Sequence, residues 1–164
     1  YNGRMNQALF LDRDGVIIEN QPNYVRSLDD VIFIPQALEA LRELSASPVK
    51  IFFVTNQSAV GRGSITLQTV MEIHRHILSV IQASGGRVDD SFICTHAPKD
   101  ACSCRKPEPG LFLQAAERYQ VNLTHSVCIG DAISDLQEGF INALDKALSE
   151  HEATSSIEIP LWVQ

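Results

Sequence analysis

The sequence predicts an α/β fold, a parallel sheet with helices on both faces. Short apolar runs alternate along the chain with segments of helical periodicity. Strands that are apolar on both faces must be covered on both, which is typical of parallel sheets. The length of 164 residues fits one such domain, and we expect 1–164 to form a single unit.

The expected strands are apolar runs rich in β-branched and aromatic residues. The clearest, "VKIFFVT", is suited to the centre of the sheet. A shorter run, "VIFI", is expected to be a strand or an extended segment. The full set is Ala8–Asp12, Val31–Ile34, Val49–Thr55, Ser91–Thr95 and Ser126–Asp131.

The expected helices lie between these runs and repeat their apolar residues every three or four positions. Pro35 suits the first turn of one, and Thr66 suits the N-cap of another. These helices span Pro35–Ala46, Thr66 to about Ser84, and Pro109–Tyr119, and a further one opens near Ser134. His74 and His76 fall on the second helix, where we expect exposed or half-packed side chains.

Composition excludes several classes of function. The net charge is −7 and the pI is about 5.1, whereas a duplex-binding surface is normally basic. No apolar run approaches the ~20 residues that span a bilayer, and "YNGRMNQ" lacks the apolar core of a signal peptide. We therefore expect a cytoplasmic protein that binds neither nucleic acid nor membrane.

Polar residues follow the apolar runs at the points where the strands should end. Ligands of parallel sheets bind at the carboxyl ends of the strands, so these residues should converge on one edge. They are Asp12, Arg13, Asp14 and Gly15; Thr55, Asn56, Gln57 and Ser58; Lys106 after a cysteine-rich stretch; and Asp131 with Asp135.

This set suits phosphoryl transfer from an ester. Asp12 and Asp131 can hold Mg²⁺, which prefers hard oxygen ligands and screens the phosphate from a carboxylate nucleophile. Thr55 and Lys106 can contact the phosphoryl oxygens as charge develops on them. Asp14 can protonate the leaving oxygen and later activate water.

Four thiol and imidazole groups lie in one loop, "CTHAPKDACSC", at Cys94, His96, Cys102 and Cys104. Their number and type favour tetrahedral zinc, with reduced packing thiols or a redox pair as alternatives. A disulfide is not expected in a cytoplasmic chain. Four protein ligands leave no open position, so the zinc would stabilise the loop that presents Arg105 and Lys106. Cys128 is expected to be a small buried hydrophobe.

The motifs "FLDRDGV", "VTNQS", "RKP" and "IGDAISD" resemble the four motifs of the haloacid dehalogenase superfamily, over Ala8 to Ile141. The resemblance implies a Rossmann-like core, an aspartyl-phosphate intermediate and catalytic Mg²⁺. It makes Asp12 the nucleophile and Asp14 the acid and base.

The resemblance also implies supporting roles. Thr55 and Lys106 would stabilise the phosphoryl group, and Asp135 would support the metal site or Lys106. Asp131 would ligate Mg²⁺ together with Asp12 and the backbone carbonyl of Asp14.

Within the superfamily, "DRDGVI", "TNQSAVGRG", "CTHAP…CSCRKPEPG" and the Tyr24-Val25 pair resemble the D-glycero-D-manno-heptose-1,7-bisphosphate 7-phosphatase family. In that family the zinc ligands match Cys94, His96, Cys102 and Cys104. The implied substrate contacts are Asn20, Tyr24, Asn56, Gln57, Ser58, Arg62 and Arg105, with Arg62 placed for the second phosphate. The alternatives are histidinol-phosphate phosphatase, which shares the zinc loop, or another phosphatase of small phosphomonoesters. A non-catalytic interaction module built on the zinc loop is a further alternative, which the intact set of Asp12, Asp14, Thr55, Lys106 and Asp131 argues against.

The spacing of the motifs leaves no room for a cap domain, so the loops at 19–30, 57–64 and 94–105 should shape the pocket. A core of this kind is expected to be a monomer. Near Ala143–Leu144 the chain departs from the family pattern. Either Ile157–Val163 replaces the family's fifth strand, or residues are missing at that junction, which is the hypothesis we favour.

Overall fold

The computed structural model describes residues 6–131, 141, 145–146 and 149, and they form the expected α/β fold. The strands are β1 (Ala8–Leu11), β2 (Lys50–Asn56), β3 (Asp90–Cys94) and β4 (Val127–Ile129). The helices are α1 (Pro35–Leu44), α2 (Ser58–Gly61), α3 (Leu67–Ala83) and α4 (Gly110–Tyr119). The short 3₁₀ turns are η1 (Leu28–Asp30), η2 (Pro98–Asp100) and η3 (Leu123–His125).

The four strands form one sheet in the order β3-β2-β1-β4, and all three pairings are parallel. The chain runs outward from β1 through β2 to β3 and then returns to the other side of β1 as β4. The order therefore reverses between β1 and β4. In open α/β sheets, ligands bind beyond the carboxyl ends of the strands at such a reversal.

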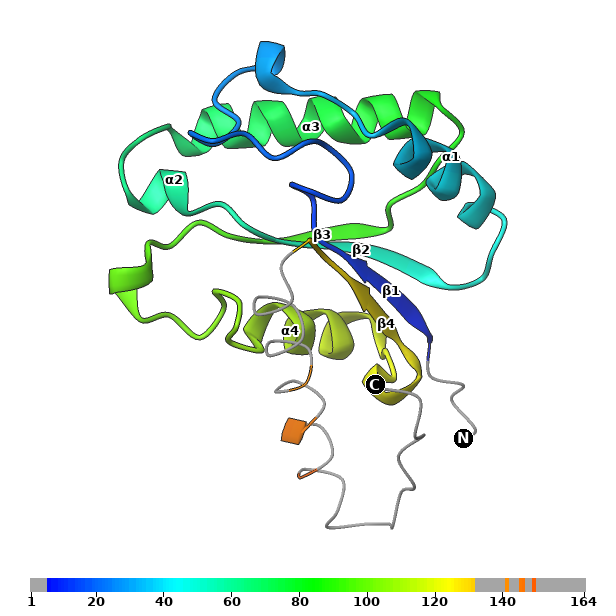
Figure 1. The fold of residues 1–164 in the computed structure, drawn as a ribbon. Coiled ribbons are helices and arrows are strands. Elements are labelled where there is room, and N and C mark those ends of the chain that lie inside the picture. The colour runs from blue at the N-terminus through cyan, green and yellow to red at the C-terminus, as the bar shows by residue number, and fades with distance from the viewer. Residues whose placement is uncertain (1–5, 132–140, 142–144, 147–148, 150–164) are drawn as a thin grey trace.

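Helices cover both faces of the sheet, as predicted: α1, α2 and α3 lie on one face and α4 on the other (Figure 1). Alternation along β2 directs Phe52 toward α4 and Phe53 toward α3. On the α4 face, the Phe10 ring lies 5.6 Å from Phe52 and 5.2 Å from Phe112, measured between centroids. The two faces thus hold two separate apolar clusters, one against α4 and one against α1 and α3.

Helix α3 forms where the pattern predicts it, but the burial of one of its residues, His74, differs from the prediction. The N-cap Thr66 accepts a hydrogen bond from the backbone N–H of Thr69, at 3.0 Å. The prediction that His74 is exposed or half-packed is wrong, because its side chain is 3% exposed. His74 lies four residues after Val70 and three before Ile77, so it shares their buried face. His76 is half-buried, as expected.

Val31–Ile34 is an extended segment, one of the two forms expected of it, and within it Phe33 makes one isolated antiparallel bridge with Ile18. One smaller prediction needs correction. Cys128 is only partly buried, because it lies on β4 at one edge of the described sheet. The short helix α2 has no counterpart among the predicted elements.

The described elements between residues 14 and 106 are those of the core itself, and they include no cap domain. Within the part of the chain that the structure describes, no helix is long and apolar enough to cross a membrane. Asp135, the helix expected near Ser134 and the alternatives for the C-terminal segment fall outside the described residues.

Candidate active site

A buried ion pair stands at the centre of the site, between Asp12 and Lys106. The Lys106 ammonium lies 3.0 Å from Oδ2 of Asp12 and donates to the Val54 carbonyl at 2.9 Å. The Lys106 side chain is 1% exposed. Burial raises the pKa of Asp12, and the charge of Lys106 offsets part of that rise. The other carboxylate oxygen accepts the backbone N–H of Arg13 at 2.8 Å, which fixes its orientation.

Asp14 is held by three hydrogen bonds. Nε of Arg13 donates to Oδ1 at 2.8 Å, and Nη2 of Arg13 donates to Oδ2 at 3.2 Å. Nε2 of Gln57 donates to Oδ2 of Asp14 at 3.0 Å and to Oγ1 of Thr55 at 2.9 Å. Gln57 therefore connects the loop after β1 to the end of β2, and it brings together three residues that were predicted to share the site.

Asn56 has a different environment from the one expected of a substrate contact. Its Nδ2 donates to the carbonyl of Lys106 at 3.0 Å, and its Oδ1 accepts the backbone N–H of Lys106 at 3.0 Å. Both ends of the amide are thus occupied by the backbone of one residue. We infer that Asn56 orients Lys106, and the substrate contact expected of Asn56 stays a prediction.

We expect Asn56→Ala to slow phosphate-ester hydrolysis about tenfold and to lower the free energy of unfolding by about 1–3 kcal/mol, because two backbone groups lose their partner. Asn56→Asp should be at least as harmful, since it places a carboxylate oxygen against the Lys106 carbonyl. Steady-state kinetics and thermal denaturation measure both effects. Gln82→Ala, which truncates an exposed amide on α3, is the matched control. Unchanged kinetics in Asn56→Ala would refute the orienting role.

Oxygen ligands suited to Mg²⁺ gather beside this pair. Nδ2 of Asn20 donates to Oδ2 of Asp131. Gly15 has a φ of +85°, and a β-carbon there would overlap both the Asp131 carboxylate and the Asn20 amide. Asp131 therefore lies against the turn that follows Asp12 and Asp14. The carboxylates of Asp12 and Asp131 and the backbone carbonyl of Asp14 are hard oxygen donors, so these residues fit Mg²⁺.

The Cys94, His96, Cys102 and Cys104 side chains converge, with all four ligand atoms within 4.8 Å of one another. The three sulfur–sulfur distances are 3.2, 3.5 and 3.6 Å, and Nδ1 of His96 lies 3.3 Å from the nearest sulfur. A zinc tetrahedron with Zn–S bonds of ~2.3 Å has edges of about 3.8 Å, so the set has the right size. Burial and the neighbouring thiols raise the pKa of Cys104 to about 12, and a bound cation would reverse this shift.

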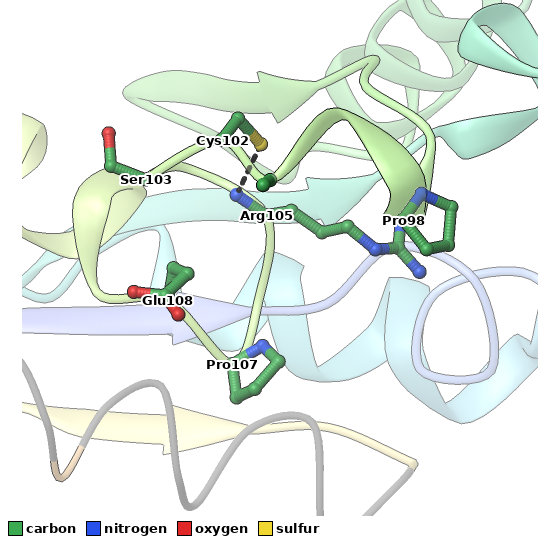
Figure 2. Close-up of a pocket in the computed structure, with 7 residues that line it drawn as sticks. Pro98, Cys102, Ser103, Arg105, Pro107 and Glu108 are labelled. Carbon is green, nitrogen blue, oxygen red and sulfur yellow. Dashed lines mark hydrogen bonds between the residues drawn. The ribbon is translucent and has the colours of Figure 1, made fainter.

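The loop 94–104, here called the zinc loop, packs closely against a glycine on each side. The N–H of Gly61 in α2 donates to Thr95 at 2.9 Å, and the N–H of Gly110 in α4 donates to Ser103 at 3.0 Å. A β-carbon at either glycine would overlap loop backbone. Figure 2 shows how the loop leads into Arg105, whose N–H donates to Cys102 Sγ at 3.3 Å. The loop is thereby held next to the Lys106 backbone.

The remaining predicted substrate contacts, Ser58, Arg62, Tyr24 and Arg105, differ in burial and in their hydrogen bonds. Ser58 is buried at the start of α2, and Arg62 is exposed at its end. Tyr24 is 44% exposed and has a φ of +65°, a strained conformation for a tyrosine that often marks a functional loop. Nη1 of Arg105 is buried without a hydrogen-bond partner among the described residues. No hydrogen bond or ion pair in the described structure joins the side chain of Tyr24 or Arg62 to the other site residues.

Two buried polar residues had no predicted role at the site, Arg13 and His74. The position of His74 could have been found from the helical pattern, since it shares the face of the apolar residues. The ion pair between Arg13 and Asp14 had no such signal, because adjacent charges in a loop are usually solvated.

A parallel sheet with its order reversed between β1 and β4, carrying an Asp-x-Asp turn, a buried lysine and a further aspartate at those strand ends, defines a phosphatase of the haloacid dehalogenase class. The chain belongs to the family described as polynucleotide kinase 3 phosphatase, whose model matches residues 7–155.

Among curated relatives, the chain is 38% identical over 131 residues to the D-glycero-beta-D-manno-heptose-1,7-bisphosphate 7-phosphatase of Bordetella bronchiseptica, covering 80% of this chain and 73% of the relative. The Helicobacter pylori (strain 26695) protein of that name is 39% identical over 135 residues, covering 82% and 78%.

Solved structures agree with the class. The D,D-heptose 1,7-bisphosphate phosphatase of B. bronchiseptica, complexed with magnesium and phosphate, superposes with a TM-score of 0.78 at 32% identity and covers 94% of this chain and 89% of that one. A putative HAD-like phosphatase from Mesorhizobium loti gives a TM-score of 0.78 at 27% identity, covering 88% and 73%.

Proposed function

We propose that this protein is a Mg²⁺-dependent phosphatase that removes the 7-phosphate of D-glycero-D-manno-heptose 1,7-bisphosphate. The observation that supports it most directly is the Asp12–Lys106 pair, a carboxylate 3.0 Å from a buried ammonium, with Asp14 two residues further on. The alignment with this chain covers about three quarters of the length of each relative that is named for this activity.

In the first step, an Oδ oxygen of Asp12 attacks phosphorus and forms an acyl phosphate. Asp14, as the carboxylic acid, gives its proton to the C7 oxygen as the P–O bond breaks. In the second step, Asp14 takes a proton from water as the water oxygen attacks phosphorus. Phosphate leaves, and Asp12 returns to a carboxylate.

The other residues would stabilise the negative charge of the phosphoryl group. Lys106 and Thr55 would donate to phosphoryl oxygens whose charge rises in the transition state; the contact of Lys106 with Asp12 and that of Gln57 with both Thr55 and Asp14 support this role. Mg²⁺, held by Asp12, Asp131 and the Asp14 carbonyl, would neutralise the phosphate that faces the nucleophile. Asn20 orients the Asp131 carboxylate through its hydrogen bond.

The rest of the substrate needs a pocket for the sugar and a cation for the second phosphate. A cavity of about 450 Å³ is lined by Pro98, Ala101, Cys102, Ser103, Arg105, Pro107 and Glu108, several of which Figure 2 shows. Arg105 and Pro107 flank the proposed phosphoryl ligand Lys106 in the chain. Arg105, with Gln57, Ser58 and Tyr24, would contact the sugar, and Arg62 would contact the second phosphate.

The zinc is proposed to be structural, because the four-ligand set leaves no position for water. Thiolate ligands suit a reducing compartment, so we propose the cytoplasm. We also propose a single domain over 1–164 that acts as a monomer. Asp135 is proposed to support the metal site.

Two other substrates are the alternatives. Histidinol phosphate is favoured by the shared zinc loop, and a 3′-phosphorylated oligonucleotide is suggested by the description of the matching family. The net charge of −7 opposes an extended polyanion.

Turnover of the heptose bisphosphate, histidinol phosphate and a 3′-phosphorylated oligonucleotide, with and without Mg²⁺, tests the proposal. We expect kcat/KM to be at least about a hundredfold higher for the heptose bisphosphate than for either alternative, a difference of about 2.7 kcal/mol in transition-state stabilisation. Activity should disappear when EDTA removes Mg²⁺ and return when Mg²⁺ is restored. A preference for histidinol phosphate or the oligonucleotide would replace the proposed substrate.

A further inference from the structure

Arg13 is buried and only partly satisfied. Its side chain is 1% exposed. Two of its nitrogens, Nε and Nη2, donate to the two oxygens of Asp14. The third nitrogen, Nη1, is buried and has no hydrogen-bond partner among the described residues. A buried guanidinium nitrogen without an acceptor is costly, so this atom indicates a missing partner.

Within the residues that the structure describes, His74 also lacks hydrogen-bond partners, and it can supply the acceptor that Arg13 lacks. Its imidazole is buried on α3, and neither Nδ1 nor Nε2 has a partner in the part of the chain that the structure describes. Burial lowers the pKa of His74 to about 4, and the charge of Arg13 acts in the same direction. At neutral pH the ring is therefore uncharged, and one of its nitrogens is a free acceptor.

The two side chains occupy the same region between the sheet and α3. Leu11 packs in the cluster on the α3 face, and Arg13 follows two residues later, in the bend after β1. Leu11 is paired with Phe53 in the sheet. The His74 ring lies 6.1 Å from the Phe53 ring, centroid to centroid, in an edge-on arrangement. Arg13 is also close enough to His74 to shift its titration.

We propose that His74 accepts a hydrogen bond from Nη1 of Arg13, after a small ring rotation or through one buried water, and thereby positions Asp14. The bond would complete a chain from His74 through Arg13 to both oxygens of Asp14. His74 contacts no reacting atom and is a positioning residue.

The consequence concerns the leaving group, and it rests on the proposed function of Asp14 as acid and base. A sugar alkoxide is a poor leaving group and needs the proton that Asp14 supplies as the P–O bond breaks. p-Nitrophenolate leaves without that help. Loss of Asp14 orientation should therefore impair alkyl esters selectively in kcat/KM, which reports steps up to the first irreversible one.

The experiment compares His74→Leu and His74→Met, which remove the acceptor, with His74→Gln, which keeps one. We expect kcat/KM for the heptose bisphosphate to fall about tenfold or more in the Leu and Met variants, as part of the 10²–10⁴-fold that a general acid supplies. For p-nitrophenyl phosphate it should change less than about twofold, and the Gln variant should recover most of the loss. Ile77→Val, a buried neighbour on the same helix face, is the control for packing.

Equal losses on both substrates, or none, would overturn the positioning role. A second readout does not depend on activity: the NMR resonance of the Arg13 Nε–H should shift in the Leu and Met variants and stay in place in Ile77→Val. An unshifted resonance in every folded variant would overturn the proposed hydrogen bond. If the wild-type protein hydrolyses neither ester, the proposed function fails, and this resonance alone decides whether His74 holds Arg13.

Discussion

Asp12→Asn is expected to reduce phosphatase turnover by about 10⁴-fold or more, because an amide cannot form the acyl phosphate. Asp12 follows β1 directly, at the reversal of strand order, and Lys106 lies 3.0 Å from its carboxylate. The substitution nearly preserves shape, and Lys106 keeps its bond to the Val54 carbonyl. We therefore expect the fold to persist, and thermal denaturation checks this alongside steady-state kinetics.

Glu39→Gln makes the same chemical change on an exposed position of α1 and is the matched control. Its kinetics should equal those of the wild-type protein within about twofold, since surface substitutions have small effects. If Asp12→Asn retained a tenth or more of the wild-type kcat, Asp12 could not be the nucleophile, and the mechanism built on it would be wrong.

Cys102→Ser is expected to lose bound zinc, to lower the free energy of unfolding by about 3 kcal/mol or more, and to reduce kcat without removing a reacting group. Loss of a structural metal belongs to the small class of changes with large effects on stability. For a chain of this size the loss corresponds to a fall in Tm of about 6–12 °C. Elemental analysis, thermal denaturation and kinetics measure the three effects.

The activity should fall because the loop holds the site indirectly. Cys102 Sγ accepts the N–H of Arg105, and Lys106 follows. Cys128→Ser is the matched control: it alters a partly buried thiol outside the four-ligand set and should leave the zinc in place. A zinc-free Cys102→Ser protein with wild-type Tm and kcat would show that the loop needs no metal.

Much of the fold could be predicted because its signals are local. The apolar runs that end at Asp12, Thr55 and Asp131 favour parallel strands, and the carboxyl ends of parallel strands meet at one edge. This is why Asp12 and Lys106, far apart in the chain, could be placed together before any geometry was known. For the apolar run at Val31–Ile34 the sequence left two forms open, a strand or an extended segment, since periodicity cannot show whether a neighbouring strand is available.

The supporting contacts could not be predicted. Nothing in "TNQS" distinguishes an amide that binds substrate from one that holds the Lys106 backbone, as Asn56 does. The bidentate contact of Arg13 with Asp14 likewise accompanies the burial of Arg13, which adjacency in the chain does not predict. Such contacts depend on differences of a few tenths of an ångström in how the elements are placed, which sequence patterns do not encode.

The central claim is that Asp12 carries the phosphoryl group during turnover. The most direct test is to quench the enzyme during hydrolysis of the heptose bisphosphate, reduce it with borohydride and map the product by mass spectrometry. Borohydride converts an aspartyl phosphate to homoserine. We predict homoserine at position 12 in the wild-type protein, and none when substrate is omitted. Full turnover with an unmodified Asp12, or homoserine at Asp14 instead, would contradict the account.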